Sequence, residues 1–291
     1  ILMIRRPPRA TQGVSSAASD VYKIQAGEQA KGATLYVTLE PCSHQGRTPP
    51  CSASLIHAGI SKVIIAMLDP NPLVLGKGQD TLIAAGIEVH TAAMNSAEAD
   101  FARVITEAFS KHIITKVPFI TAKFAMSLDG KIATANGQSR WISGNEARLE
   151  AHRIRGKNDA VMIGIGTALA DDPLLTVRNQ PKKPNKQPLR IVIDSKGRLP
   201  RNSAMFKEQG NILIVTAQID EKHAQSLGGK NIEVLQCPSP DGSVDLVKLL
   251  QILGQRDVTS ILVEGGPTIL GSLLTLGLID KFIAFVSPVI I

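Results

Sequence analysis

The chain of 291 residues has few of the features that mark secreted, membrane or nucleic-acid-binding proteins. Its three cysteines are an odd number and no secretory hydrophobic stretch is present, so we expect a reducing, cytoplasmic compartment without a disulfide framework. No run of about 18 apolar residues exists, which argues against a membrane span. Aromatic residues make up only 3% of the chain, leaving few rings on which single-stranded bases could stack.

The remaining composition fits a globular protein with two cores. At this length, 44% of apolar residues can fill two domains. The net charge of +7 favours an anionic partner, and small phosphorylated ligands fit better than nucleic acid. We therefore expect no nucleic-acid partner and no membrane partner, and the sequence leaves a homo-oligomer open.

Two cysteines form half of a candidate metal site. An apolar run at 33–39 predicts a buried strand that ends at Pro41, so that Cys42 lies where the strand passes into a loop. After a turn-rich segment, Cys51 begins a helical pattern at 51–59. Two cysteines nine residues apart are weak evidence by themselves, because buried cysteine is equally common as a core residue.

The sequence around these cysteines is more specific. Zinc nucleobase deaminases combine His-x-Glu with a later Pro-Cys-x-x-Cys. The stretch Thr-Leu-Glu-Pro-Cys-Ser-His-Gln-Gly-Arg-Thr-Pro-Pro-Cys at 38–51 closely resembles the bifunctional deaminase-reductase family of riboflavin biosynthesis, in which the longer cysteine spacing is normal. The resemblance implies that Cys42 and Cys51 are ligands of Zn²⁺.

The third zinc ligand and the catalytic glutamate of a deaminase are missing. None of the histidines is followed two residues later by glutamate; they are His44, His57, His90, His112, His152 and His223. His44 lies only two residues after Cys42, so good tetrahedral geometry is not expected. The resemblance places His-Ala-Glu just before Ala26. We therefore predict that this polypeptide does not deaminate.

The N-terminal stretch has no helical or strand period. Residues 1 to about 25 resemble a translated sequencing adapter, with Arg-Arg-Pro-Pro-Arg and Ser-Ser-Ala-Ala-Ser-Asp-Val-Tyr-Lys, and we interpret them as a non-native or disordered leader. A natural basic leader such as a transit peptide is the alternative.

Alternating helices and strands predict an α/β protein with largely parallel sheets. In a first domain at 26–115 we expect strands at 33–39, 62–67 and 87–91 and helices at 51–59, 76–85 and 96–113. In a second domain at 117–291 we expect a strand from Phe119, further strands at 159–166, 189–194, 211–216, 233–236 and 260–263, and helices at 146–155 and 241–253.

The second domain contains a candidate phosphate site. Glu264-Gly-Gly-Pro follows a predicted strand and opens a helix, where free amide groups and the helix dipole favour an anion. An ordinary tight turn is the alternative, and the motif is not the dinucleotide fingerprint Gly-x-Gly-x-x-Gly.

Five ordered motifs resemble the reductase half of the same family. They begin at Lys123, Ser139, Gly166, Val192 and Val263. The resemblance implies a cytidine-deaminase-like three-layer domain followed by a dihydrofolate-reductase-like domain. The latter would use NADPH to reduce the ribosyl side chain of a phosphorylated pyrimidine to ribityl.

The resemblance also assigns site residues. It implies that the NADP site is lined by Ala125, Trp141, Thr167, Asp171, Ser195, Gly266, Pro267, Thr268, Ile269, Leu270, Gly271 and Ser272. The residues that it implies face the substrate are Ser139, Arg155, Leu175, Arg178 and Glu264.

Side-chain chemistry is consistent with several of these roles. Arg155 and Arg178 could clamp a phosphate, and Trp141 could stack on the cofactor. Asp171 is our candidate for assisting proton transfer. Each residue also has a structural explanation, because Trp141 could be core, Arg178 a solvated strand end and Asp171 part of a turn.

The apolar stretch 280–291 is expected to pair inside a sheet. Because the family continues beyond this point, we expect the fragment to be truncated at both ends, with its deaminase domain lacking an N-terminal part and its reductase domain lacking closing strands. The leading hypothesis is a two-step riboflavin enzyme. The alternatives are a reductase with a non-catalytic deaminase-like scaffold and, with less support, a nucleic-acid deaminase or binding protein.

Overall fold

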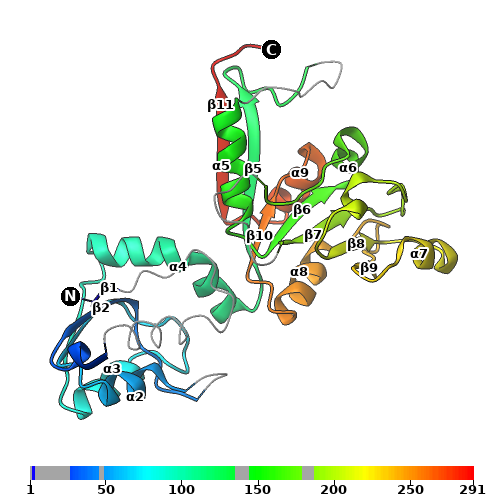
Figure 1. The fold of residues 1–291 in the computed structure, drawn as a ribbon. Coiled ribbons are helices and arrows are strands. Elements are labelled where there is room, and N and C mark those ends of the chain that lie inside the picture. The colour runs from blue at the N-terminus through cyan, green and yellow to red at the C-terminus, as the bar shows by residue number, and fades with distance from the viewer. Residues whose placement is uncertain (1, 4–26, 46–48, 135–143, 179–186) are drawn as a thin grey trace. The chain divides into compact units, whose positions relative to one another are not determined.

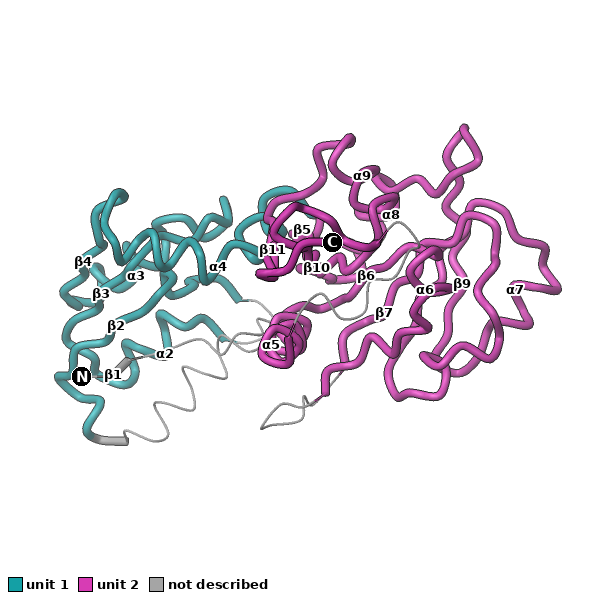
Figure 2. The backbone as a smooth tube through the Cα atoms, turned by 90° about the horizontal axis from the view of Figure 1, so that it is seen from above, with its two compact units in different colours: residues 1–116 teal, residues 117–291 magenta. Residues whose placement is uncertain are grey.

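The computed structural model describes residues 2–3, 27–45, 49–134, 144–178 and 187–291 (Figure 1). The chain divides into two compact units, residues 1–116 and 117–291 (Figure 2). Each unit has its own hydrophobic core and its own sheet, in which all strand pairs are parallel.

Unit 1 is built on a four-stranded sheet with the order β1-β2-β3-β4. The strands are β1 (Leu2–Met3), β2 (Thr34–Leu39), β3 (Lys62–Met67) and β4 (Glu88–Thr91). The helical segments are η1 (Gly27–Ala30), α2 (Cys51–His57), α3 (Lys77–Ala84) and α4 (Ala97–Thr115).

Helices cover both faces of this sheet. Helix α4 lies over one face and α2 and α3 lie on the other (Figure 1). Strand β3 is central, and its Val63 and Ile65 are fully buried against Leu82 of α3. Ser96 caps α4 by accepting a hydrogen bond from the Ala99 amide. The three-layer arrangement therefore follows from the apolar strands and the helices between them.

Two residues of the predicted leader, Leu2 and Met3, are described, and they are extended. These two residues form β1, which pairs with Leu35 and Tyr36 of β2. The exposed edge of β2 offers unpaired backbone groups to a short extended segment without requiring any sequence period. The rest of the predicted leader, at residue 1 and at 4–26, lies outside the described residues.

Unit 2 is built on a seven-stranded sheet with the order β11-β5-β10-β6-β7-β8-β9. The strands are β5 (Phe119–Ser127), β6 (Ala160–Gly164), β7 (Leu189–Ile193), β8 (Ile212–Thr216), β9 (Ile232–Gln236), β10 (Ser260–Val263) and β11 (Lys281–Ser287). The helical segments are α5 (Asn145–Arg155), α6 (Ile165–Asp171), η2 (Ala204–Lys207), α7 (Glu221–Leu227), α8 (Leu246–Gln255) and α9 (Pro267–Thr275).

The order of the strands reverses between β6 and β10, and the carboxyl ends of these two strands are called the crevice below. From β6 the chain proceeds through β7, β8 and β9 in one direction, whereas from β10 it continues to β11 at the opposite edge. Such a reversal leaves a gap at the carboxyl ends of the two strands, which is where open parallel sheets bind ligands. The residues that follow β6 and β10 are therefore placed to form a site.

Two elements of unit 2 differ from the sequence prediction. The helix expected at 241–253 begins at Leu246, because the Asp245 side chain caps it by accepting a hydrogen bond from the Lys248 amide. The strand expected at 159–166 ends at Gly164, and α6 begins at the next residue. A continuous apolar run conceals this change from strand to helix.

Candidate active site

Cys42 and Cys51 lie next to each other in unit 1. The Cys51 amide donates to the Cys42 sulfur over 3.4 Å, and the Ser52 amide donates to the Cys42 carbonyl over 3.0 Å. A hydrogen bond from the Cys51 side chain lowers the pKa of the Cys42 thiol to about 6; burial opposes this, while the Cys51 amide and His44 support it. Cys42 therefore favours the thiolate, which is the form that binds metal.

The cysteine pair does not complete a zinc site among the described residues. In that part of the chain, no group of three or more His, Cys, Asp or Glu residues could hold a metal ion. His44 is exposed and joins no such group. Catalytic zinc takes three protein ligands and water. The side chains that the structure describes therefore do not fit the zinc ion of a deaminase.

Glu40 is committed to backbone hydrogen bonds. Its carboxylate is only 3% exposed and accepts from the amides of Asp69, Gly76, Gly78 and Gln79 over 2.8–3.1 Å. Four amide donors occupy the lone pairs of the carboxylate. Glu40 therefore fixes the loop 69–79 beside Cys42 and does not replace the missing catalytic glutamate.

Gly78 is part of the same contact. A Cβ atom added there would lie 1.8 Å from the Pro41 carbonyl oxygen and 3.1 Å from a Glu40 carboxylate oxygen. Only glycine allows the start of α3 to approach this closely. The roles of Glu40 and Gly78 could not be predicted from the sequence, because an acidic residue and a glycine in a loop give no pattern that points to a partner almost forty residues away.

The predicted NADP residues gather at the carboxyl ends of the strands in unit 2. Ala125 lies near the end of β5, Thr167 in the first turn of α6 and Ser195 just after β7. The Gly266 amide donates to the Thr167 hydroxyl over 2.9 Å, which joins the segments that follow β10 and β6. The structure thus brings Thr167 and Gly266 together across the crevice.

Helix α9 begins as the sequence predicts. Gly266 is its extended N-cap residue and Pro267 occupies the first turn. The remaining predicted residues, Thr268, Ile269, Leu270, Gly271 and Ser272, lie within the helix. Ile269 packs into the core, where a Cβ on Gly265 would meet its side chain at 2.0 Å. Only the first turn of α9 is therefore placed to bind an anion through its amides.

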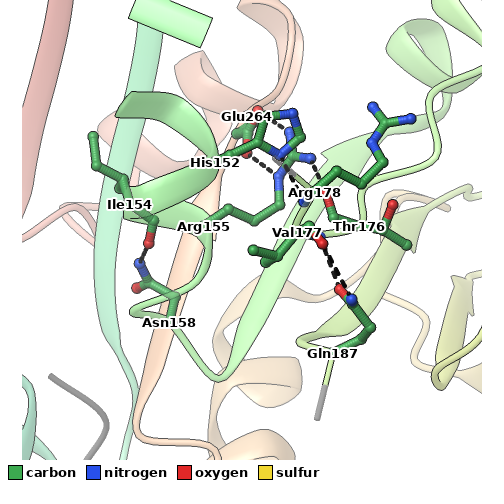
Figure 3. Close-up of polar contacts among 9 residues, drawn as sticks. All are labelled: His152, Ile154, Arg155, Asn158, Thr176, Val177, Arg178, Gln187 and Glu264. Carbon is green, nitrogen blue, oxygen red and sulfur yellow. Dashed lines mark hydrogen bonds and ion pairs between the residues drawn. The ribbon is translucent and has the colours of Figure 1, made fainter. Parts of the chain in front are cut away.

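Arg155 and Glu264 form an ion pair at the crevice. Arg155 donates from Nε to Oε1 over 2.8 Å and from Nη2 to Oε2 over 2.9 Å (Figure 3). Its Nη1 donates to the Thr176 carbonyl over 2.7 Å. The two side chains are only 11% and 13% exposed. This geometry is the bidentate form of an arginine–carboxylate pair.

Charges around Glu264 determine its ionisation. Burial raises the pKa of its carboxyl group, but the charge and hydrogen bonds of Arg155, together with the charge of Lys123, outweigh this and leave the pKa below its usual range. Burial lowers the pKa of Lys123, and Glu264 opposes that change. The crevice therefore holds a carboxylate among three basic side chains, an arrangement suited to an anionic, hydrogen-bonding ligand.

Two further predicted substrate residues, Leu175 and Arg178, lie on the segment after α6. Leu175 is buried and has a φ of 55°, whereas Arg178 is exposed. The Arg178 guanidinium points away from the Arg155–Glu264 pair (Figure 3) and has no polar partner among the residues described here. The prediction that both arginines bind phosphate stays a prediction. Arg155 binds Glu264, and Arg178 binds no polar group through its guanidinium within the described part of the chain.

The predicted roles of three further residues gain no support from the structure. Asp171 is the last residue of α6 and is half-buried, so its role in proton transfer remains a prediction. Ser139 and Trp141 lie outside the described residues.

Comparison with known proteins identifies both halves of the chain. Residues 118–291 match the model of the RibD C-terminal domain, and residues 11–67 match that of the cytidine and deoxycytidylate deaminase zinc-binding region. The riboflavin biosynthesis protein RibD of Aquifex aeolicus is 42% identical over 265 residues, which are 91% of this chain and 71% of the relative.

The chain belongs to the RibD family.

Further RibD proteins support this assignment. RibD of Escherichia coli is 41% identical over 274 residues, covering 90% of this chain and 72% of the relative. The structure of Acinetobacter baumannii RibD superposes with a TM-score of 0.80 at 38% identity, covering 94% of this chain and 74% of that one. The deaminase match includes residues 11–25, which the sequence analysis assigns to the leader.

A Thermotoga maritima protein links the family to two reactions. It is described as a diaminohydroxyphosphoribosylaminopyrimidine deaminase and 5-amino-6-(5-phosphoribosylamino)uracil reductase. It superposes with a TM-score of 0.78 at 32% identity, covering 94% of this chain and 72% of that one. The predicted fold class, a deaminase-like domain followed by a RibD reductase domain, is confirmed, as is the assignment to riboflavin biosynthesis.

Within the described residues, no helix is long and apolar enough to span a membrane.

Proposed function

We propose that this chain reduces the ribosyl side chain of a phosphorylated, deaminated aminopyrimidine with NADPH, and that its deaminase unit does not deaminate. The observation that carries the first part is the crevice of unit 2, in which Glu264 and Arg155 meet the Gly266–Thr167 contact. It lies within the segment that matches the RibD C-terminal domain.

In the proposed reductase site, one group of residues binds the cofactor and another binds the substrate. The first turn of α9 would offer amides to the cofactor's phosphates, next to Thr167. Arg178 offers a free guanidinium to the substrate phosphate, which matches its fork geometry. Glu264, whose two carboxylate oxygens accept from Arg155, would lie on the substrate side. NADPH, when bound, would supply the hydride, and the chain's residues orient the two ligands.

Loss of deamination is proposed from the cysteine site. The printed sequence contains no His-x-Glu, and the described residues add no third ligand to Cys42 and Cys51. Glu40 is occupied by four amides and cannot move a proton between water and substrate. The deaminase unit would then serve as a scaffold that carries no deaminase chemistry of its own.

A direct test uses the purified 291-residue chain. We expect NADPH oxidation with 5-amino-6-(5-phosphoribosylamino)uracil, no ammonia release from the diaminopyrimidine precursor and less than one zinc per chain. Absence of NADPH oxidation would remove the reductase proposal. Stoichiometric zinc together with ammonia release would remove the proposed loss of deamination.

The proposed partners are small phosphorylated pyrimidines, with no nucleic acid and no membrane. A homo-oligomer remains part of the proposal, and sedimentation of the chain with and without NADPH measures it. An RNA mobility shift at physiological salt would favour the nucleic-acid alternative, which the 3% aromatic content argues against.

A further inference from the structure

The segment 174–178 follows α6 and belongs to no helix or strand. It nevertheless carries two predicted substrate residues, Leu175 and Arg178. Leu175 has a φ of 55°, a left-handed conformation that is unfavourable for a branched side chain. Asp172, shortly before it, has a φ of 41°. Because this segment belongs to no helix or strand, we expect side-chain hydrogen bonds to stabilise its backbone conformation.

Side chains from other elements bind the backbone of this segment. Arg190 of β7 donates from Nη1 to the Leu174 carbonyl over 3.4 Å, and Arg155 donates to the Thr176 carbonyl over 2.7 Å. His152 of α5 accepts from the Arg178 amide at Nδ1 over 3.3 Å (Figure 3).

Gln187 makes the most specific of these contacts. Its Oε1 accepts from the Val177 amide over 2.8 Å, and its Nε2 donates to the Val177 carbonyl over 3.2 Å (Figure 3). One side-chain amide thereby takes the place of a neighbouring antiparallel strand, which would exchange the same two bonds with Val177. Gln187 lies two residues before β7 begins. The side chain that binds Val177 is therefore held next to a strand whose register with β6 is fixed.

We infer that Gln187 is a positioning residue for substrate binding. By fixing both polar groups of Val177, it determines that the Val177 side chain faces the core and that the next side chain, Arg178, is exposed. The inference deepens the proposed reductase function, on which it rests, by naming a residue that orients the phosphate-binding cation without touching the phosphate.

The closest alternative is a purely structural role for Gln187. Its Cβ packs near Gly210, where an added Cβ would lie 3.0 Å away, so the stem also fills space. Two substitutions separate these roles. Gln187→Glu keeps the size and the acceptor but removes the donor and sets a carboxylate against the Val177 carbonyl. Gln187→Ala removes both hydrogen bonds.

The experiment compares the full-length variants Q187A and Q187E with the control Q225A. Gln225 is a glutamine of α7 whose amide donates to Glu221 at the surface. For both Gln187 variants we expect KM for 5-amino-6-(5-phosphoribosylamino)uracil to rise about tenfold, the effect of losing roughly 1.4 kcal/mol of ground-state binding. KM for NADPH and kcat should stay within about twofold of the wild type, and Q225A should match it throughout.

Amide hydrogen exchange in the absence of any ligand provides a second readout. We expect the Val177 amide to exchange faster in Q187A, which removes its acceptor, whereas the β7 amides keep their protection. An unchanged KM for the pyrimidine, an equal rise in both KM values or unchanged exchange at Val177 would overturn the inference. If Q187A fails to fold, the isosteric Q187E decides. If the wild type reduces no substrate, the proposed function fails and exchange at Val177 still decides the role of Gln187.

Discussion

Glu264 is the acidic partner of a buried ion pair in unit 2. It accepts two hydrogen bonds from Arg155, and both side chains have low exposure. If one partner is removed, water therefore does not take its place beside the remaining charge. The exposed pair between Glu233 and Arg256 has similar distances, but its side chains are 53% and 40% exposed. Comparing the two ion pairs therefore isolates the effect of burial on their contribution to stability.

We predict that Glu264→Gln lowers the free energy of unfolding by about 3 kcal/mol, because Arg155 keeps its charge without a counter-ion. Glu233→Gln should cost less than about 1 kcal/mol, as is usual for exposed pairs. Urea unfolding of the full chain, followed by circular dichroism, measures both. Equal effects of the two substitutions would show that burial does not govern the Arg155–Glu264 pair.

A second prediction at this scale concerns His152. Burial, followed by the charges of Arg155 and Arg178, lowers its pKa below the ordinary 6.5, although Glu264 opposes this change. Its Nδ1 accepts from the Arg178 amide, so the neutral ring is the bound form. The unfolded chain therefore binds more protons than the folded chain just below pH 6.5, and stability must fall as the pH falls through that window.

The measurement is the urea midpoint between about pH 8 and pH 5 for the wild type and for His152→Gln, which keeps an acceptor but does not titrate. We expect the wild type to lose more stability below pH 6.5 than the variant. Other titrating groups affect both proteins alike. Parallel curves would contradict the assignment of Nδ1 as the acceptor of a neutral ring.

At the scale of elements, the junction of β2 and α3 is held by a close approach. Gly78→Ala would place Cβ 1.8 Å from the Pro41 carbonyl oxygen, which belongs to the backbone and cannot rotate away. We predict a loss of about 3 kcal/mol or more, together with faster amide exchange at Gly76 and Gln79, which Glu40 binds.

The control is Gly271→Ala in α9. A Cβ at that position would meet nothing within 4 Å, so alanine should stabilise the helix by about 0.5–1 kcal/mol. Thermal unfolding of both variants gives the signs. A neutral Gly78→Ala would show that the junction relaxes and that Glu40 does not fix the loop 69–79.

Elements that depend on local pattern could be predicted from the sequence. The strands at Lys62–Met67 and Ser260–Val263 are continuous apolar runs, and α9 starts where glycine and proline place it. Contacts between distant segments could not be predicted. Gln187 sits at the end of a polar, proline-containing stretch that is typical of a solvated loop, and nothing local shows that its amide binds Val177. The left-handed Leu175 is equally hidden, because leucine gives no sign of a positive φ.

At the scale of the whole molecule, one chain carries two α/β units, each with its own candidate site. Among the described residues, unit 1 offers two sulfur ligands and an occupied glutamate, whereas unit 2 offers a carboxylate, a free guanidinium and a helix N-terminus at one crevice. Membership of the RibD family explains why both units occur in one chain. It does not make their sites equally competent, since chemistry depends on the residues at the site.

NADPH consumption with two substrates tests this account most directly. The purified chain is given either the diaminopyrimidine ribosyl phosphate or its deaminated counterpart, in parallel and with zinc present. We predict that NADPH is consumed with the deaminated compound alone, because unit 1 does not convert the diaminopyrimidine into a substrate for unit 2. Consumption with the diaminopyrimidine accompanied by release of ammonia, or no consumption with either compound, would contradict it.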